Sequence, residues 1–188
     1  ELVGAAATLV AERFITEDIE IPEDVAPLIY GAIVSNTLNF KGNVTTDRDK
    51  NVAKYLKDKH GFSDNFAHDM FVAKSNVEGE GLVRSIREDF AYFRGWKFNG
   101  KTIGIAQIET LEGEEKTVSI KENIITELDD IKDNLKIDVI GFSVVDLEAN
   151  QNLFYCPDRY SEEIFSKALG LKFDDGVARR VGLILRKE

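Results

Sequence analysis

Two adjacent arginines near the end of the chain, Arg179 and Arg180, are the residues best suited to chemistry in this sequence. A guanidinium group carries a fixed positive charge and a planar fork of donors that matches phosphate oxygens in pairs. The formal net charge is −10, so such a doublet is a local exception on an acidic chain. The pair indicates a phosphate site, unless it only balances Asp174 and Asp175 at the surface.

The other reactive side chains are few, and they form no catalytic motif. His60 and His68 lie in separate predicted helices without an acidic partner at ligand spacing, so we interpret both as structural or surface residues. Together with the single cysteine, Cys156, they cannot complete a tetrahedral zinc site. The sequence contains no glycine-rich phosphate-binding loop, no nucleophile elbow and no paired-histidine metal motif. We therefore assign no catalytic residue and expect no self-sufficient active site.

Composition and charge exclude several classes of function. A chain of 188 residues that is 43% hydrophobic can bury the core of one domain. The acidic balance disfavours nucleic acid and anionic membranes as partners, and no apolar run is long enough to cross a bilayer. One cysteine cannot form an internal disulfide, which favours a cytoplasmic protein. The start at Glu1, without a signal peptide, indicates a fragment of a longer protein.

The hydrophobic pattern predicts that the first half of the chain is helical. Apolar residues at three- and four-residue steps indicate a helix over 3–14, and a nearly continuous apolar run indicates a buried helix over 25–34. Thr46 and Asp49 have the spacing of a capping box, which predicts a third helix that Gly61 ends. Two more helices are expected over 63–74, capped by Ser63, and over 80–93.

Beyond Gly95 the pattern becomes that of a sheet. A hairpin is predicted over 96–98 and 102–110, with its turn at Asn99 and Gly100. Further strands are expected over 137–145, 153–156 and 181–185, with helices over 124–135 and from Ser161 to Gly170. The predicted fold class is α/β: a helical N-terminal part followed by a mixed β-sheet with flanking helices, in a single domain over 1–188.

Three segments carry a resemblance to a known family. They are ELVGAAAT at 1–8, GAIVSNTLNF at 31–40, which is the most specific, and GIAQIET at 104–110, and the likeness continues in order to GVARR at 176–180. The sequence resembles the C-terminal domain of family II, manganese-dependent inorganic pyrophosphatases and of related exopolyphosphatases of the DHH superfamily. That part is the DHH-associated domain of the second type, and the resemblance covers essentially the whole chain.

The resemblance implies a two-domain phosphohydrolase of which this chain is the substrate-binding part. An N-terminal DHH domain, missing from this chain, would carry the Asp-His-His motif and most ligands of a two-manganese cluster. The C-terminal domain would close over the cleft and present Arg179 and Arg180 to pyrophosphate or polyphosphate. One aspartate at the end of the buried helix would bind Mn²⁺, and Asn36 holds that position in this sequence.

Three departures from the family pattern fall on this implied site. Asn36 offers Mn²⁺ a neutral amide oxygen in place of a carboxylate, so we expect metal affinity to drop. Ala91 stands where the family has a phosphate-binding lysine. The family's Ser-Arg-Lys-Lys-Gln reads Ala-Arg-Arg-Val-Gly at 178–182, so two cationic positions remain.

These observations leave three functional hypotheses. The first is a substrate-binding, cleft-closing domain of a manganese-dependent phosphoanhydride hydrolase, inactive when isolated. The second is a non-catalytic module that binds a phosphate ligand or regulates a partner. The third is a structural domain whose helix over 3–14 forms a homodimer or packs on the missing domain. The first two predict that the arginine doublet faces the same hollow as the end of the buried helix at Asn36.

Overall fold

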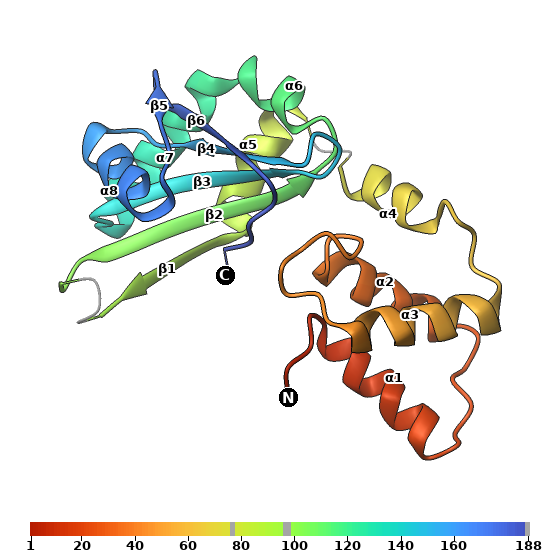
Figure 1. Cartoon of the computed structure of the whole chain (residues 1–188). Helices are drawn as coiled ribbons and strands as arrows, with labels where there is room; N and C mark the ends of the chain where they lie inside the picture. The colour runs from red at the N-terminus through yellow and green to blue at the C-terminus, as the bar shows by residue number, and fades with distance from the viewer. Residues whose placement is uncertain (76–77, 96–98, 187–188) are drawn as a thin grey trace. The chain divides into compact units, whose positions relative to one another are not determined.

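The computed structural model describes residues 1–75, 78–95 and 99–186, which form two compact units. Unit 1 contains residues 1–74 and unit 2 begins at Ser75 (Figure 1). The division separates the helical N-terminal part from the sheet, so the predicted α/β class with a helical start is confirmed. The sequence pattern predicts one domain over 1–188, whereas the described residues divide into two compact units.

Unit 1 is a group of helices packed around α2. The described helices are α1 (Ala6–Thr16), α2 (Ala26–Asn36), α3 (Asp47–His60) and α4 (Phe66–Lys74). Helix α2 contacts the other three, and Ile29, Ile33 and Val34 are among its buried residues. Tyr30 adds an aromatic contact, with its ring centroid 5.0 Å from that of Phe66. The predicted burial of this segment is therefore confirmed.

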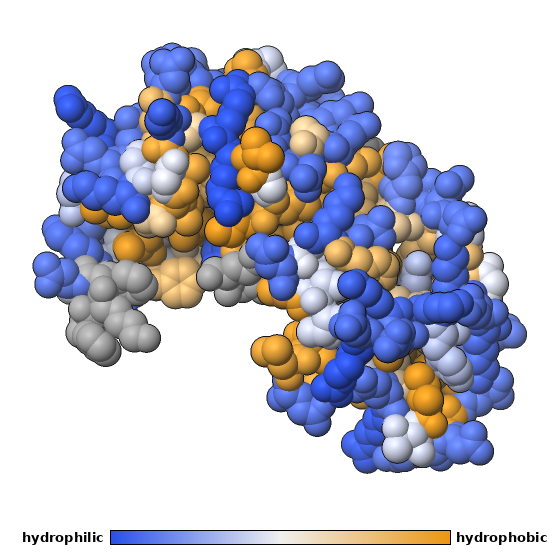
Figure 2. Space-filling view, viewed as in Figure 1, coloured by the Kyte–Doolittle hydropathy of each residue, from blue (hydrophilic) through white to orange (hydrophobic). Residues whose placement is uncertain are grey.

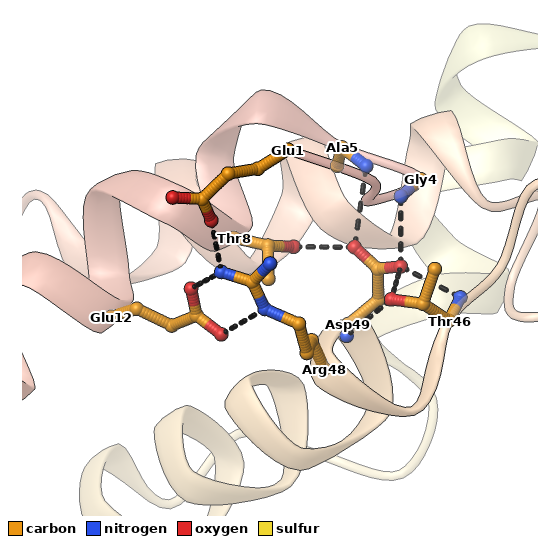
Figure 3. A network of polar contacts seen from close by, with 8 residues as sticks. All are labelled: Glu1, Gly4, Ala5, Thr8, Glu12, Thr46, Arg48 and Asp49. Atoms are coloured by element: carbon orange, nitrogen blue, oxygen red, sulfur yellow. Dashed lines mark hydrogen bonds and ion pairs between the residues drawn. The ribbon is translucent and has the colours of Figure 1, made fainter.

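The carboxylate of Asp49 joins the start of α1 to the start of α3 (Figure 3). Its Oδ1 accepts hydrogen bonds from Thr8 Oγ1 at 2.5 Å and from the Ala5 amide at 3.2 Å. Its Oδ2 accepts from the Gly4 amide at 2.9 Å, and from the amide and hydroxyl of Thr46 at 2.8 and 2.7 Å. The bonds with Thr46 complete the predicted capping box. One buried carboxylate therefore satisfies donors from two separate segments.

Gly4 is required for this close approach of the N-terminal segment. A Cβ atom at Gly4 would lie 2.9 Å from Thr37 Cγ2 and 3.0 Å from both Asp49 Oδ2 and the Val44 carbonyl oxygen. Any side chain there would push the segment away from the loop that follows α2. A second link lies nearby, where Arg48 on α3 pairs with the carboxylates of Glu1 and Glu12.

Unit 2 is a mixed sheet with helices on both faces. In the described residues the sheet has the order β1-β2-β3-β4-β6-β5, with β2 and β3 parallel and the other pairs antiparallel. Every residue of β3 is buried, because this strand is covered on both faces. The strands are β1 (Phe90–Arg94), β2 (Thr102–Thr110), β3 (Val139–Asp146), β4 (Gln151–Tyr155), β5 (Phe173–Asp174) and β6 (Val177–Val181).

The two faces of this sheet carry separate cores. Helices α5 (Gly79–Glu88) and α7 (Lys121–Leu135) pack on one face, where Phe142 and Leu153 belong to the same buried cluster as residues of both helices. Helix α8 (Arg159–Leu169) packs on the other face, where Phe154 meets Phe165. A short helix, α6 (Gly113–Val118), follows β2 and contacts β3. Successive residues of a strand therefore enter different cores.

The structure corrects the predicted helix over 80–93. The helix α5 ends at Glu88, and residues 90–94 form β1, which pairs with β2 from Phe90 opposite Ala106. The Phe90 ring occupies the space over Gly104, where a Cβ would lie 2.4 Å from Phe90 Cζ. Packing of the Phe90 ring on Gly104, which has no side chain, favours the strand, although the spacing of the apolar residues also fits a helix. The strand predicted over 96–98 falls on residues outside the described part of the chain.

Helix α6, strand β6 and the cap of α8 also differ from the prediction. Helix α6 was not predicted, because six residues contain too little periodicity to identify a helix. The last strand covers 177–181 instead of 181–185, because Val177 and Ala178 fill the two cores and Gly182 leaves the strand with a φ of 82°. The cap of α8 is Asp158, which accepts a hydrogen bond from the Ser161 amide at 3.0 Å.

On the face shown in Figure 2, apolar residues lie among hydrophilic ones. Single exposed apolar residues are normal on folded proteins. None of the helices in the described part of the chain has the length and hydrophobicity that crossing a bilayer requires. The most exposed large apolar side chains are Leu2, Leu28, Tyr92 and Val181.

We predict that unit 1 loses stability when Asp49 is neutralised. Burial opposes ionisation of Asp49, but its hydrogen bonds outweigh burial and lower its pKa from 3.8 to about 2. That difference corresponds to about 2 kcal/mol of folding free energy at neutral pH. Because the folded-state pKa lies below the unfolded one, the contribution is complete above about pH 4 and is lost as the pH falls towards 2.

The variant Asp49→Asn should therefore unfold about 2 kcal/mol more easily at pH 7, and its stability should vary less between pH 4 and pH 2. Urea unfolding followed by far-ultraviolet circular dichroism measures both effects. Asp47→Asn is the matched control, because its side chain is 94% exposed at the same helix end, and a change within about 0.5 kcal/mol is expected. Equal losses in the two variants would contradict the role given to the Asp49 carboxylate.

Candidate phosphate-binding site

Arg179 and Arg180 lie side by side on β6, and their side chains leave the strand on opposite faces. Arg179 is paired in register with Leu153 of β4, and Arg180 with Asn152. Leu153 belongs to the core beneath α5 and α7, so Arg179 emerges on that face and Arg180 on the face that carries α8. The adjacency in sequence therefore does not place the two guanidinium groups on one face of the sheet.

Arg179 forms a two-bond ion pair with Glu114 of α6. Its Nε and Nη2 atoms both donate to Glu114 Oε1, at 2.9 and 2.5 Å. Gln151 Nε2 donates to the other carboxylate oxygen at 3.1 Å. The hydrogen bond from Arg179 lowers the pKa of Glu114, although partial burial opposes this, and the same bond raises the pKa of Arg179. Both groups are therefore charged at neutral pH.

Arg180 lies beside the C-terminal segment of the chain. The side chain is half-buried, and its Nη1 donates to the Gly182 carbonyl oxygen at 3.2 Å. Next to it, the Asn152 amide group bonds both the carbonyl and the amide of Ile184, at 2.9 and 3.0 Å. The Arg186 amide donates to Gln107 Oε1 at 2.6 Å. Buried polar side chains of the sheet thus hold this segment on the face where Arg180 emerges.

An acidic hollow of about 390 Å³ lies at the end of the sheet where Glu114 is placed. A phosphate group that approached Arg179 through this hollow would meet several carboxylates and be repelled. Asp146, the buried member of the group, accepts hydrogen bonds from the amides of Glu148 and Ala149 and so stabilises the turn after β3. The lining residues are Glu112, Glu114, Glu115, Asp146, Glu148, Ala149 and Gln151.

Asn36 is the last residue of α2 and belongs to unit 1. Its side chain is exposed, and Nδ2 donates to the Ala32 carbonyl oxygen at 3.0 Å. The three residues from Leu38 to Phe40 have φ values of 52°, 52° and 64°, although none is glycine. Each such residue costs about 1 kcal/mol or more in the left-handed region. The backbone strain is therefore concentrated directly after Asn36.

Thr37 holds this strained turn in place. Its hydroxyl donates to the Ile33 carbonyl at 2.7 Å and accepts from the Phe40 amide at 3.3 Å. Its carbonyl accepts from the Gly42 amide at 2.9 Å. Leu38 anchors the turn in the core, since it is completely buried. The direction in which the chain leaves α2 at Asn36 is thus fixed by several contacts.

The structure also places the other residues that the sequence singles out. His60 stacks on the Phe62 ring at 5.8 Å between centroids, which agrees with a structural role. Cys156 is buried, and burial raises the pKa of its thiol, so the reactive thiolate is disfavoured. Ala91 is half-buried on β1. Asn36 and the two arginines belong to different units, so their expected meeting at one hollow stays a prediction.

The sequence alone gives no indication that Glu114 and Gln151 lie at this site. Glu114 lies in the unpredicted helix α6, 65 residues before Arg179. Gln151 begins β4, and no motif connects it with either residue. An ion pair between distant segments leaves no local signal in a single sequence, so only the folded chain identifies this pair.

Comparisons with known proteins agree with this architecture. The chain is 33% identical to a manganese-dependent inorganic pyrophosphatase of Methanocaldococcus jannaschii, over 99% of this chain and 62% of that protein. It is 28% identical to a cobalt-dependent inorganic pyrophosphatase of Clostridium perfringens, over 100% of this chain and 34% of that protein. The chain therefore spans about a third to three fifths of the length of these relatives.

A solved structure supports the same relationship over the whole fold. It is that of a Methanococcus jannaschii protein described as a family II inorganic pyrophosphatase. The match has a TM-score of 0.83 and 30% identity, and it covers 100% of this chain and 62% of that one. The DHHA2 domain family matches residues 68–187, which is more than half of the chain. The resemblance noted in the sequence is thereby confirmed, and the chain belongs to the DHHA2 domain family.

Proposed function

We propose that this chain is the substrate-binding and cleft-closing domain of a manganese-dependent phosphoanhydride hydrolase. The substrate class is pyrophosphate or a short polyphosphate. The observation that carries the proposal is the match along 99% of the chain with a manganese-dependent inorganic pyrophosphatase. The retention of two adjacent arginines on β6 adds chemical support, because guanidinium groups bind phosphate oxygens well. The setting we propose is the cytoplasm, and the catalytic partner is a DHH domain that precedes this chain.

The placement of the arginines limits where the terminal phosphate binds. The two side chains leave β6 on opposite faces, so the strand itself separates them over most of its length. β6 ends at Val181, whose side chain is 89% exposed. Beyond this end, β6 no longer lies between the two faces on which the arginines emerge. We therefore place the terminal phosphate there, at the rim of the acidic hollow, since Val181 is paired in register with Gln151, which lines the hollow.

The chain by itself does not fit a manganese site. Among the described residues, no group of three or more His, Cys, Asp and Glu side chains could hold a metal ion. Asn36 could offer one neutral amide oxygen, which attracts a dication weakly. Metal ions in such hydrolases supply an activated water and charge stabilisation. This chain can supply the cations that bind the substrate, and the DHH domain must supply the metal ligands.

A non-catalytic phosphate-binding or regulatory module is the second candidate function. The observation that favours it is the set of substitutions at the implied site: Asn36 in place of an aspartate and Ala91 in place of a lysine. A protein with this site could retain affinity for a phosphate ligand and lose turnover. A homodimer through α1 remains a third hypothesis, in which Val10 is exposed on the helix and Ala11 is buried.

The proposal predicts that both arginines contribute to substrate binding. In the chain joined to its catalytic domain, Arg179→Ala and Arg180→Ala should each weaken pyrophosphate binding by about tenfold, because each loses a charge-assisted hydrogen bond. Phosphate release from pyrophosphate and tripolyphosphate with Mn²⁺ measures the effect, and the isolated 188-residue chain should release none. Arg159→Ala is the control, since that side chain is 90% exposed on α8.

The outcomes separate the three hypotheses. Loss of binding together with measurable turnover supports the hydrolase domain. Binding without phosphate release, detected by calorimetry, selects the non-catalytic module. Unchanged behaviour of both arginine variants would leave only the structural hypothesis.

The substitution at Asn36 generates a separate prediction. Asn36→Asp should raise the affinity for Mn²⁺ by tenfold or more, about 1.4 kcal/mol, in the chain joined to its catalytic domain, because a carboxylate replaces a neutral amide. Titration of Mn²⁺ followed by electron paramagnetic resonance measures this affinity. Asn39→Asp adds the same charge to an exposed position of the loop that follows α2 and should have little effect. An equal gain in both variants would show a general charge effect and would contradict the metal role of position 36.

A further inference from the structure

We propose that Glu114 is a positioning residue for Arg179, holding one edge of its guanidinium group so that the opposite edge faces the phosphate ligand. The inference rests on the proposed function, because it takes Arg179 as a ligand of phosphate. It adds Glu114, and Gln151 behind it, as residues on which phosphate binding depends.

The geometry of the pair shows which edge remains for the ligand. Glu114 Oε1 accepts from Nε and Nη2 of Arg179, which form the side edge of the guanidinium group. The end edge, made of Nη1 and Nη2, is a second planar fork that matches two phosphate oxygens. The Arg179 side chain is 51% exposed, so a ligand can reach it. An ion pair on one edge therefore leaves the guanidinium group able to bind an anion on the other.

Glu114 is itself held by the fold. Its amide lies 3.4 Å from Asp146 Oδ2, which ties the start of α6 to the end of β3. Gly113 permits this approach, because a Cβ there would lie 2.9 Å from Val144 Cγ1. Farther along α6, the Tyr155 hydroxyl of β4 donates to Thr117 Oγ1 at 2.7 Å. The helix that carries the carboxylate is thus bonded to two strands of the sheet.

Gln151 completes the arrangement from β4. Its Nε2 donates to Glu114 Oε2, so the carboxylate receives bonds on both oxygens and cannot rotate freely. Arginine has a long side chain whose ordering costs free energy when a ligand binds. If Glu114 orders Arg179 beforehand, the ligand does not bear this cost. The negative charge of Glu114 acts in the opposite direction, because it repels the anion.

Two substitutions at Glu114 separate positioning from repulsion. Glu114→Ala removes both the bonds and the charge, whereas Glu114→Gln removes the charge and keeps an oxygen that accepts from Arg179. We expect Glu114→Ala to weaken binding of pyrophosphate to the 188-residue chain about fivefold, the order of one immobilised side chain. We expect Glu114→Gln to bind within about twofold of the parent chain or more tightly. Isothermal calorimetry measures both.

Glu115→Ala is the matched control for charge. Glu115 is exposed, neighbours Glu114 in sequence and lines the same hollow, and it makes no hydrogen bond with Arg179. Its removal should leave binding unchanged or slightly tighter. Equal tightening in the Glu114→Ala, Glu114→Gln and Glu115→Ala variants would overturn the proposal, because Glu114 would then act only as a repelling charge.

A second measurement tests positioning without a ligand. The Nε–H proton of Arg179, observed by nuclear magnetic resonance, should exchange slowly with water in the parent chain and in Glu114→Gln, and rapidly in Glu114→Ala. Similar exchange in all three would overturn the proposal even if no variant binds pyrophosphate. Arg179→Ala tests the proposed function separately. If this variant binds pyrophosphate as the parent chain does, Arg179 is not a phosphate ligand, and the proposed function is wrong on this point whatever the exchange data show.

Discussion

The pleat of a sheet that is covered on both faces is the constraint on which unit 2 depends. β3 is buried along its whole length, and its neighbours send alternate residues into two separate cores. The same alternation divides Arg179 from Arg180 at β6. A cationic doublet in the sequence therefore becomes two single cations on opposite faces of the sheet. The sheet decides this arrangement, and the phosphate site we propose must conform to it.

Charge is distributed unevenly around this site. Carboxylates line the hollow near Glu114, while Arg180 emerges on the opposite face beside the C-terminal segment. The carboxylates repel an anion on the first side, and the positive charge of Arg180 attracts one on the second. In our proposal the Glu114 carboxylate thus has two opposing effects on phosphate binding: it orients Arg179, and it repels the anion.

Unit 1 shows how one buried charge supports a strained segment. Asp49 binds the start of α1 to the start of α3, and Gly4 brings the N-terminal segment against Thr37. The left-handed turn from Leu38 to Phe40 lies in the loop held between them. Strain of this kind persists only where surrounding contacts determine it, and it is common at functional sites. Asn36 lies directly before this turn.

The sequence by itself determined the local features and the family. The capping box of Thr46 and Asp49, the buried α2 and the α/β class follow from spacing and periodicity, which act over a few residues. It could not separate helix from strand at Phe90, where both periods fit, and it could not reveal the partner of Arg179. Those features depend on Gly104 beneath the Phe90 ring and on Glu114, 65 residues away. Only the tertiary structure decides them, because contacts between segments distant in the sequence exist only in the folded chain.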